Sequence, residues 1–293
     1  MSKIEWTRND DGTEGKTWNP IGGCSVVSPG CTNCYAMRMA ARIEKMQPDS
    51  HYKGLTRQVN GNPVWTGKIA RAPDKTFYAP SKWKKPTRVF VNSMSDLFHE
   101  DVADEWIDDV FAIMRYQDRH EYQILTKRPA RMRDYVRNRY NFFTMLNDKA
   151  AFNDGKPTPF VAPNIWLGVS AEDQARADER IPLLLDTPAA VRFISAEPLL
   201  GPIDLSRFIR RRRVIDAAGS LDDDWKQKIL DWVIVGGESG PGKRAVNPEW
   251  LRDVRDQCRA AGVPLFVKQI DKVIPIPDDL MIREWPEAKG IEA

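Results

Sequence analysis

Three of the chain's four cysteines lie close together, at Cys24, Cys31 and Cys34, in a segment rich in glycine and proline. Thiolates bind zinc or hold iron–sulfur clusters, and a turn-rich loop lets the backbone bring three of them to one place. Three thiolates leave one iron of a four-iron cluster free for another ligand, whereas a structural zinc ion needs a fourth protein ligand. The segment therefore predicts a metal centre, and the number of cysteines favours a cluster with an open iron.

A zinc ion could occupy the loop instead of a cluster, and its fourth ligand would then be Cys258 or His51. Leu251, Val254, Cys258 and Ala261 share one face of an expected helix, so Cys258 is expected to be a buried core thiol. His51 lies in an irregular polar stretch. With three histidines in all, a metallohydrolase site built from several of them is not expected. A zinc-stabilised nucleic-acid-binding protein without redox chemistry stays open as the second hypothesis.

The overall composition is that of a globular protein. The chain has 293 residues, 42% hydrophobic and 29% charged, with a mean hydropathy of −0.51 and a net charge of +3. No apolar run approaches the ~20 residues of a membrane span, and the first residues lack the apolar core of a signal peptide. We therefore expect a cytoplasmic protein without membrane contact. Thiols stay reduced there, so clustered cysteines indicate metal ligands and not disulfides.

Short β-branched or aromatic runs recur along the chain, and amphipathic segments lie between several of them. The expected strands are 17–22, 88–92, 122–126, 165–170, 191–195, 232–235 and 264–268, and the expected helices are 104–117, 172–185 and 247–261. Asn247, Pro248 and Gly262 supply the cap residues of the last helix. Alternating strands and helices indicate parallel pairing through right-handed crossovers. The fold class is α/β, a TIM-like (β/α) barrel that is complete or partial, with a doubly wound sheet as the alternative.

A compact polar cluster follows nearly every expected strand. In a barrel all these clusters converge on one mouth, whereas in an open sheet only those near the switch point meet. This placement favours the barrel. We expect a single domain over 1–293, with irregular insertions near 48–86, 141–163 and 204–231.

The cysteine spacing resembles the cluster loop of radical S-adenosylmethionine enzymes. The spacing here is Cys-x6-Cys-x2-Cys, whereas theirs is usually Cys-x3-Cys-x2-Cys, and the residue before the third cysteine, often aromatic there, is Asn33. A Gly-Gly-Glu sequence occurs at 236–238, after a late strand, whereas in those enzymes it usually follows the second strand. The whole chain also resembles a phage-encoded three-cysteine-motif family of uncharacterised function. The matching stretches are TWNPIGGC (17–24), VNSMSDLFH (91–99), ILTKRP (124–129), FISAEPLLG (193–201) and VIVGGESG (233–240).

The resemblance implies a [4Fe–4S] cluster that reductively cleaves S-adenosylmethionine to a 5′-deoxyadenosyl radical, which then acts on an unknown substrate. It also implies an electron donor such as a flavodoxin or ferredoxin. The implied cluster ligands are Cys24, Cys31 and Cys34. The implied S-adenosylmethionine-binding residues are Ser93, Ser95 and Asp96 at the methionine end, Ser170 and Glu172 at the ribose, and Gly236 and Gly237. The implied catalytic or carboxylate-binding residues at the mouth are Lys127, Glu197, Glu238 and Lys268. Each charged or hydroxyl residue at a strand end could equally be a helix cap.

Basic residues interleaved with aromatic ones point to a nucleotide or nucleic-acid substrate. Such residues occur at 128–140 and 82–85, and 210–213 is a further basic run; the combination of basic and aromatic residues suits phosphate contact and base stacking. A solvated helix face is the alternative explanation for the same pattern.

Overall fold

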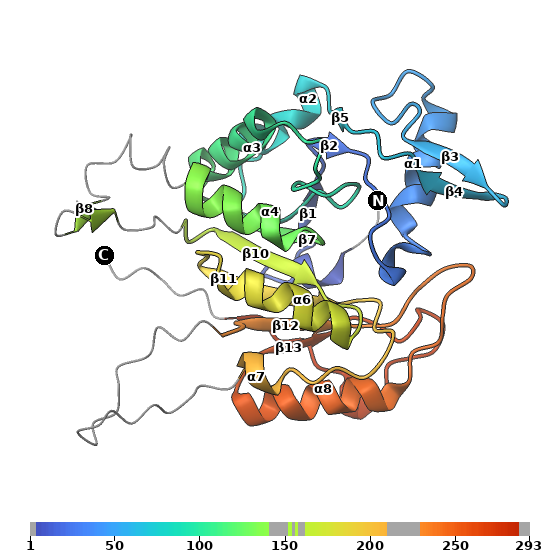
Figure 1. The fold of residues 1–293 in the computed structure, drawn as a ribbon, viewed down its shortest axis with the longest axis vertical. Helices are drawn as coiled ribbons and strands as arrows, with labels where there is room; N and C mark the ends of the chain where they lie inside the picture. Colours follow the sequence, from blue (N-terminus) through green and yellow to red (C-terminus); the bar gives the residue numbers. More distant parts are fainter. Residues whose placement is uncertain (1–3, 141–151, 154–155, 158–161, 210–228, 287–293) are drawn as a thin grey trace.

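A seven-stranded parallel sheet forms the frame of the protein. The computed structural model describes residues 4–140, 152–153, 156–157, 162–209 and 229–286. The strand order is β1-β6-β7-β10-β11-β12-β13, and every neighbouring pair is parallel. These strands are β1 (Lys16–Trp18), β6 (Arg88–Val91), β7 (Glu121–Thr126), β10 (Ile165–Ser170), β11 (Val191–Ala196), β12 (Trp232–Val235) and β13 (Leu265–Val267). The sheet curls, and its edge strands β1 and β13 do not pair within the described residues, so the fold is a partial (β/α) barrel (Figure 1).

All seven expected strands are confirmed, with one difference at the first. The expected strand 17–22 divides into β1 and a separate β2 (Ile21–Gly22), which pairs antiparallel with β5 (Ala70–Arg71). The chain thus leaves the sheet just before Cys24. The cysteine loop begins on this small second sheet and passes over the carboxyl ends of the main strands.

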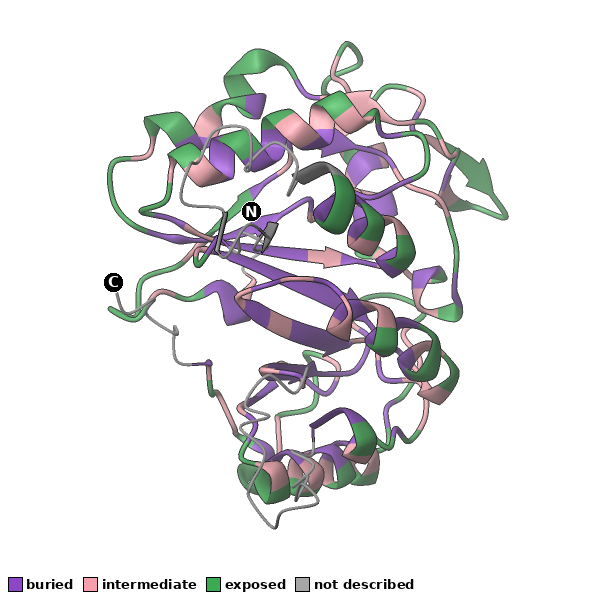
Figure 2. Ribbon diagram, turned by 60° about the vertical axis from the view of Figure 1, so that its left-hand side comes forward, coloured by how far each residue is buried: buried purple, intermediate pink, exposed green. Residues whose placement is uncertain are grey.

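Side chains along each strand alternate between the two faces of the sheet, and the apolar side chains of each face belong to a separate core. In β12, Val233 and Val235 pack outward with the helices, whereas Trp232 and Ile234 face the inside of the curl. Strands buried on both faces carry almost continuous apolar runs, and Figure 2 shows the central strands buried along nearly their whole length. The inner face is unusually aromatic; its buried members are Trp6, Phe90, Trp166, Val191, Phe193, Trp232, Ile234 and Phe266.

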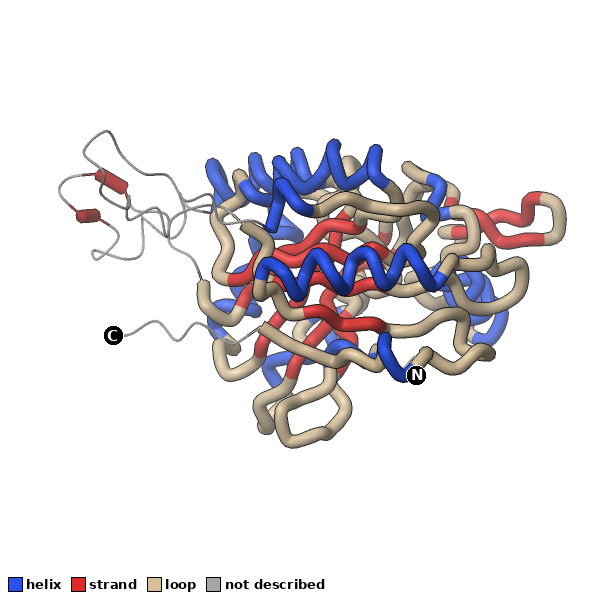
Figure 3. The backbone as a smooth tube through the Cα atoms, turned by 90° about the horizontal axis from the view of Figure 1, so that it is seen from below, coloured by secondary structure: helices blue, strands red, loops and turns tan. Residues whose placement is uncertain are grey.

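Helices cover the outer face of the curl (Figures 1 and 3). The longer of these are α3 (Asp104–Tyr116), α6 (Gln174–Leu185) and α8 (Pro248–Ala261); the shorter ones are α2 (Asp74–Phe77), α4 (Pro129–Asp134) and α7 (Ser206–Ile209), with a π-helical turn at Tyr135–Tyr140. Helix α1 (Tyr35–Met46) instead packs against residues 52–65, at the carboxyl ends of the strands. Single 3₁₀ turns lie at Glu5–Thr7, Pro29–Cys31, Ala79–Lys82 and Asp278–Leu280. Hairpins join β3 (Thr56–Val59) to β4 (Asn62–Trp65) and β8 (Phe152–Asn153) to β9 (Lys156–Pro157). The β3–β4 hairpin extends beyond the sheet (Figure 3).

The three expected helices are confirmed, and their caps explain their limits. The Asn247 side chain accepts a hydrogen bond from the Glu249 N–H, and Gly262 ends α8 in the left-handed region at φ 67°. The expected helix 172–185 begins two residues later, at Gln174, because Asp173 is its N-cap and accepts from the Arg176 N–H. Glu172 therefore lies outside the helix, in the turn that follows β10.

The ends of the described chain close the bottom of the curl. Trp6 contacts Phe90 with ring centroids 4.7 Å apart, and the Trp285 indole N–H donates to the Trp6 carbonyl at 2.9 Å. Arg283 adds an ion pair with Glu5 at 2.5 Å. These contacts fill the inner face below the strand ends and leave the space above them open.

Of the three expected insertions, the first lies within the described residues and the other two lie mostly outside them. Segment 48–86 forms β3, β4, β5, α2 and a 3₁₀ turn. Most of 141–163 and 204–231, and the basic run 210–213, lie outside the described residues. Among the helices that are described, none combines the length and apolarity needed to cross a bilayer.

Gly168 in the middle of β10 is required by the aromatic packing inside the curl. A Cβ at this position would lie 2.5 Å from the Phe193 ring. We expect Gly168→Ala to lower the free energy of unfolding by about 1–3 kcal/mol because the ring must leave its place. Urea unfolding checks this, with Gly201→Ala as the control, since no atom lies within 4 Å of a Cβ there. Equal effects of the two substitutions would contradict the packing described here.

Candidate metal and cofactor site

A cavity of about 550 Å³ lies at the carboxyl ends of the strands, inside the mouth of the partial barrel. Its floor is apolar, with Trp6, Phe90 and Leu125, and its walls carry the polar strand ends. Cavities of this size hold cofactor-sized ligands. The convergence expected from the sequence is thus confirmed for this mouth.

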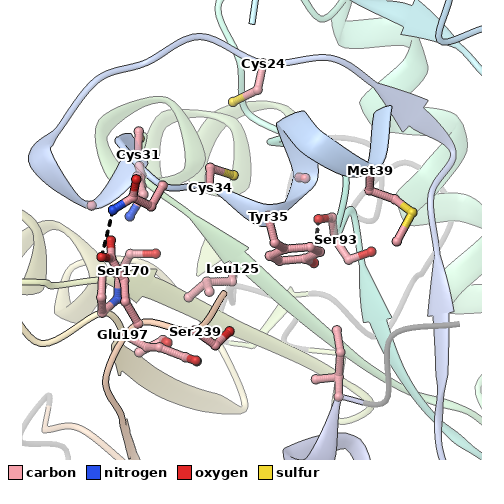
Figure 4. A pocket seen from close by; sticks show the side chains of 18 of the residues that line it. Cys24, Cys31, Cys34, Tyr35, Met39, Ser93, Leu125, Ser170, Glu197 and Ser239 are labelled. Atoms are coloured by element: carbon pink, nitrogen blue, oxygen red, sulfur yellow. Dashed lines mark hydrogen bonds between the residues drawn. The ribbon is translucent and has the colours of Figure 1, made fainter. Parts of the chain in front are cut away.

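All three loop cysteines line this cavity. In Figure 4, Cys24, Cys31 and Cys34 lie along one side, across from Ser170, Glu197 and Ser239. Burial raises the pKa of Cys24 to about 12, and the nearby Asp96 carboxylate adds to this. Burial also raises the pKa of Cys34. The free thiols of Cys24 and Cys34 are therefore protonated near neutral pH, and a bound metal would have to displace their protons.

The loop ends at the N-terminus of helix α1. Cys34 is the N-cap residue of α1, and the backbone N–H groups of Ala36 and Met37 stabilise its thiolate. Such N–H groups and the helix dipole favour anionic sulfur. This geometry suits a ligating cysteine better than a packed core thiol.

Neither candidate for a fourth zinc ligand joins the loop cysteines. Cys258 is 1% exposed in the core between α8 and the sheet, as expected, and burial raises its pKa to about 12. His51 stacks on Tyr52 with ring centroids 4.2 Å apart and does not line the cavity. Within the described residues, no three Cys, His, Asp or Glu side chains lie close enough together to hold a single metal ion.

The residues expected at the methionine end line the cavity but are already bonded within the protein. Ser93 donates to the Asn19 amide oxygen at 3.1 Å, and Ser95 donates to the Ile21 carbonyl at 2.8 Å. Asp96 accepts from Thr126 at 2.6 Å and pairs with Arg128 at 3.0 Å. Their clearest contacts therefore hold the loop between β6 and α3 in place.

The remaining expected binding residues divide between the cavity and the protein interior. Ser170 and Gly237 line the cavity, whereas Gly236 and Glu172 do not. Glu172 is fully buried and pairs with Lys127 at 3.3 Å and Arg180 at 3.0 Å. Burial alone would raise its pKa, but the two cations outweigh burial and hold the pKa at about 2. Glu172 is thus a permanent carboxylate that is neutralised inside the protein.

The four expected catalytic residues, Lys127, Glu197, Glu238 and Lys268, all line the cavity, and each forms an ion pair. Lys268 bonds both Glu197 oxygens, at 2.7 and 2.9 Å. Glu238 pairs with Arg244, and the hydrogen bonds from Arg244 outweigh burial and lower the pKa of Glu238. Lys127 pairs with Glu172, as described above. The pairing leaves little free charge on these walls.

Three residues at the cavity carry buried polar atoms without a hydrogen-bond partner. Both side-chain atoms of the Asn92 amide lack a hydrogen-bond partner although the residue is 3% exposed, and its φ is 59°. The Gln269 Oε1 and the Arg128 Nη2 atoms also lack partners. Buried polar groups are normally satisfied, so three unpaired groups around one cavity indicate a polar ligand. All three residues belong to the polar clusters that follow strands, but the sequence does not show which atoms of these clusters stay unpaired.

Arginines in the basic stretch at 128–140 form ion pairs. Arg131 and Arg137 pair with Asp104 and Asp186 at 2.7 and 2.5 Å. Tyr135 is 6% exposed and belongs to the core. The contact of this stretch with a nucleic acid stays a prediction.

Solved structures with a related fold are distant. The chain is similar to a cysteine-to-serine mutant of spore photoproduct lyase, with 10% identity, a TM-score of 0.41, and coverage of 86% of this chain and 76% of that one. It is also similar to spore photoproduct lyase complexed with dinucleoside spore photoproduct, with 11% identity, a TM-score of 0.33, and coverage of 82% and 60%. Similarity at this level assigns no function.

Sequence comparison gives a family without an activity. No curated protein matches the chain significantly. One family model, of uncharacterised function, matches residues 1–290, nearly the whole chain, while the phage origin and the three-cysteine motif of the expected family stay predictions. The chain belongs to the family described as "Protein of unknown function (DUF5131)".

Proposed function

We propose that the protein is an iron–sulfur enzyme of the radical S-adenosylmethionine type, with Cys24, Cys31 and Cys34 as the ligands of a [4Fe–4S] cluster. The observation that carries the proposal is that three thiols from one loop line a single cofactor-sized cavity at the barrel mouth. When bound, the cluster would supply the electron that cleaves the sulfonium bond of S-adenosylmethionine.

The donor set fits a cluster better than a single ion. In a four-iron cluster each thiolate binds a different iron, so the three sulfurs need not converge on one point. The described residues include no three side chains that converge on a single ion. The apolar floor formed by Trp6, Phe90 and Leu125 limits solvent access from below, which is one of the means by which proteins tune a cluster.

The unpaired polar atoms fit a ligand that both donates and accepts hydrogen bonds. The Asn92 amide offers one acceptor and two donors, Gln269 offers an oxygen and Arg128 an N–H. The amine, carboxylate and adenine of S-adenosylmethionine carry the complementary groups. We expect Ser170 and the backbone of Gly237, which line the same cavity, to complete this surface.

The charge of the cavity rim favours a phosphate-bearing substrate. Arg38, Arg42 and Lys272 line the cavity, and no carboxylate pairs with any of them among the described residues. Arg38 instead donates to the carbonyls of Pro241 and Asn33, at 3.3 and 3.4 Å. Unpaired cations attract phosphates, so we propose a nucleotide or nucleic-acid substrate.

Removing two of these cations should weaken binding of a single-stranded oligonucleotide. For Arg42→Gln combined with Lys272→Gln we expect about a tenfold loss of affinity, with the salt slope lowered by about 1.4, because two phosphate contacts are lost. Fluorescence anisotropy at several salt concentrations measures both. The control is Lys75→Gln combined with Arg259→Gln, which removes two exposed cations away from the cavity.

If a mononucleotide binds as well as the oligonucleotide, the substrate is a nucleotide. An unchanged slope would contradict the rim assignment.

Anaerobic reconstitution tests the proposed function. The protein is incubated with iron and sulfide and reduced, and its EPR spectrum is recorded with and without S-adenosylmethionine. A [4Fe–4S]⁺ signal that shifts on adding S-adenosylmethionine is the expected result, because the ligand would bind the open iron. Absence of a cluster, with stoichiometric zinc in the native protein, would overturn the proposal.

A further inference from the structure

Each loop cysteine stands next to a residue that is hydrogen-bonded to a different strand end. Ser25 follows Cys24, Gly30 precedes Cys31, and Asn33 precedes Cys34. Their partners are His99, Glu172 and Glu238, which follow β6, β10 and β12. The chain separations are 74, 142 and 205 residues, so the three contacts exist only in the folded barrel.

The Glu172 contact is the most deeply buried of the three. One carboxylate oxygen accepts from the Ser28 hydroxyl and from the Gly30 N–H, the latter at 3.3 Å. The other accepts from Lys127 and Arg180. A Cβ on Gly30 would lie 2.8 Å from the first oxygen, so the glycine permits the close approach. The Glu172 residue is 0% exposed. One of its carboxylate oxygens therefore binds the cysteine loop, and the other binds the cations of Lys127 and Arg180.

The Glu238 contact holds the other end of the loop. One oxygen accepts from the Asn33 amide at 2.9 Å and from the Arg244 backbone N–H at 2.8 Å. Arg244, which is paired with the same carboxylate, also donates to the Pro29 carbonyl at 3.0 Å. Glu238 and Arg244 thus bind the loop on both sides of Cys31.

The His99 contact fixes the start of the loop. The Asp101 N–H donates to the Nδ1 atom of His99 at 3.1 Å, so the proton of the neutral ring is on Nε2. The Nε2–H group then donates to the Ser25 hydroxyl at 2.6 Å. Burial, with nearby Arg128, lowers the pKa of His99, which is consistent with the neutral ring.

We infer that His99, Glu172 and Glu238 are positioning residues that hold the cysteine loop in its ligating shape before any metal is bound. The purpose of a preformed loop, which is to bind a cluster, rests on the proposed function. The hydrogen bonds that support the inference lie within the protein and do not depend on that function. A preformed loop needs no ordering when its ligands bind, which favours cluster uptake. Glu172 and Glu238, which the resemblance in the sequence analysis implies at the ribose and among the catalytic residues, would thus act on the ligand through the loop.

Alkylation of the metal-free protein tests the inference one cysteine at a time. The full chain is treated with iodoacetamide, and mass spectrometry follows each cysteine separately. For Glu172→Gln we expect Cys31 to react at least about tenfold faster, because losing a charged hydrogen-bond acceptor opens the loop. The core thiol Cys258 should keep its rate and thereby report that the fold is intact.

Two further variants separate geometry from charge and from folding. Ser28→Ala removes one donor without changing any charge, and we expect about a fivefold increase at Cys31. Glu121→Gln is the matched control, because Glu121 is a largely buried carboxylate paired with Arg88 at 2.8 Å at the opposite end of the sheet. It should leave all three loop cysteines unchanged.

The outcomes distinguish this inference from the proposed function. Unchanged Cys31 rates in both Glu172→Gln and Ser28→Ala would overturn the inference, as would an equal acceleration of Cys258. If the wild-type protein takes up no cluster, the proposed function fails while the alkylation result still decides whether the loop is preformed. If it does take up a cluster, Glu172→Gln should bind less iron than Glu121→Gln under the same conditions.

Discussion

Alanine at Cys24, Cys31 or Cys34 is expected to abolish cluster assembly, whereas Cys258→Ala is expected to leave it intact. Each loop thiolate would hold a different iron, so each substitution leaves one iron without its protein ligand. Cys258 lies in the core, away from the cavity lining. Iron and sulfide per chain after anaerobic reconstitution, together with the visible absorbance of the cluster, measure the effect. We expect about one cluster in the wild type and less than about a tenth of one in each loop variant.

The stability of the metal-free variants serves as the control for this experiment. Cys258→Ala removes a buried sulfur and should lower the free energy of unfolding by about 1–2 kcal/mol, whereas the loop variants should stay within about 1 kcal/mol of the wild type. The most destabilised variant would then be the one that keeps its cluster. If Cys258→Ala lost the cluster and one loop variant retained it, Cys258 would be a ligand and the zinc hypothesis would return.

The strands were predictable because their signal is local. A parallel strand covered on both faces must be apolar at nearly every position, and β10 and β12 are buried throughout. The caps of α8 were equally visible, since Asn247 and Gly262 act on neighbouring backbone. The break between β1 and β2 was not visible, because it depends on β2 pairing with a strand some fifty residues later.

The contacts that shape the site could not be read in the same way. The sequence placed Glu172 and Glu238 at strand ends, but not their partners Arg180 and Arg244. A carboxylate after a strand has the same local sequence whether it faces a ligand or a buried arginine. What decides between these cases is the side chain that folding brings opposite, and here each acid that converges on the mouth already has a cation beside it.

The same reasoning explains why Asn92 was missed. An asparagine after a strand usually satisfies itself with nearby backbone, and it tolerates positive φ. Only the structure shows that its amide is buried without a partner at the cavity. The charged residues attract notice in a sequence, yet in this site the neutral amides Asn92 and Gln269 retain unused hydrogen-bonding capacity.

Removing the indole of Trp6 is expected to destabilise the protein strongly. Trp6 is 3% exposed, forms part of the cavity floor, and lies 4.7 Å from Phe90 and 6.2 Å from Trp232 between ring centroids. Replacement by alanine leaves a large hole in the aromatic core inside the curl. We expect Trp6→Ala to lower the free energy of unfolding by about 3–5 kcal/mol in urea.

The matched control is Trp106→Ala in α3, where the indole is only partly buried against the core. Because less apolar surface is lost there, its effect should stay below about 2 kcal/mol. Trp6→Ala should also weaken binding of S-adenosylmethionine to the reconstituted protein, since the cavity loses part of its floor, while Trp106→Ala should not. A loss of stability for Trp6→Ala no larger than that for Trp106→Ala would mean that the chain's first turn does not close the barrel. The cavity would then lack the apolar floor on which the proposed chemistry depends.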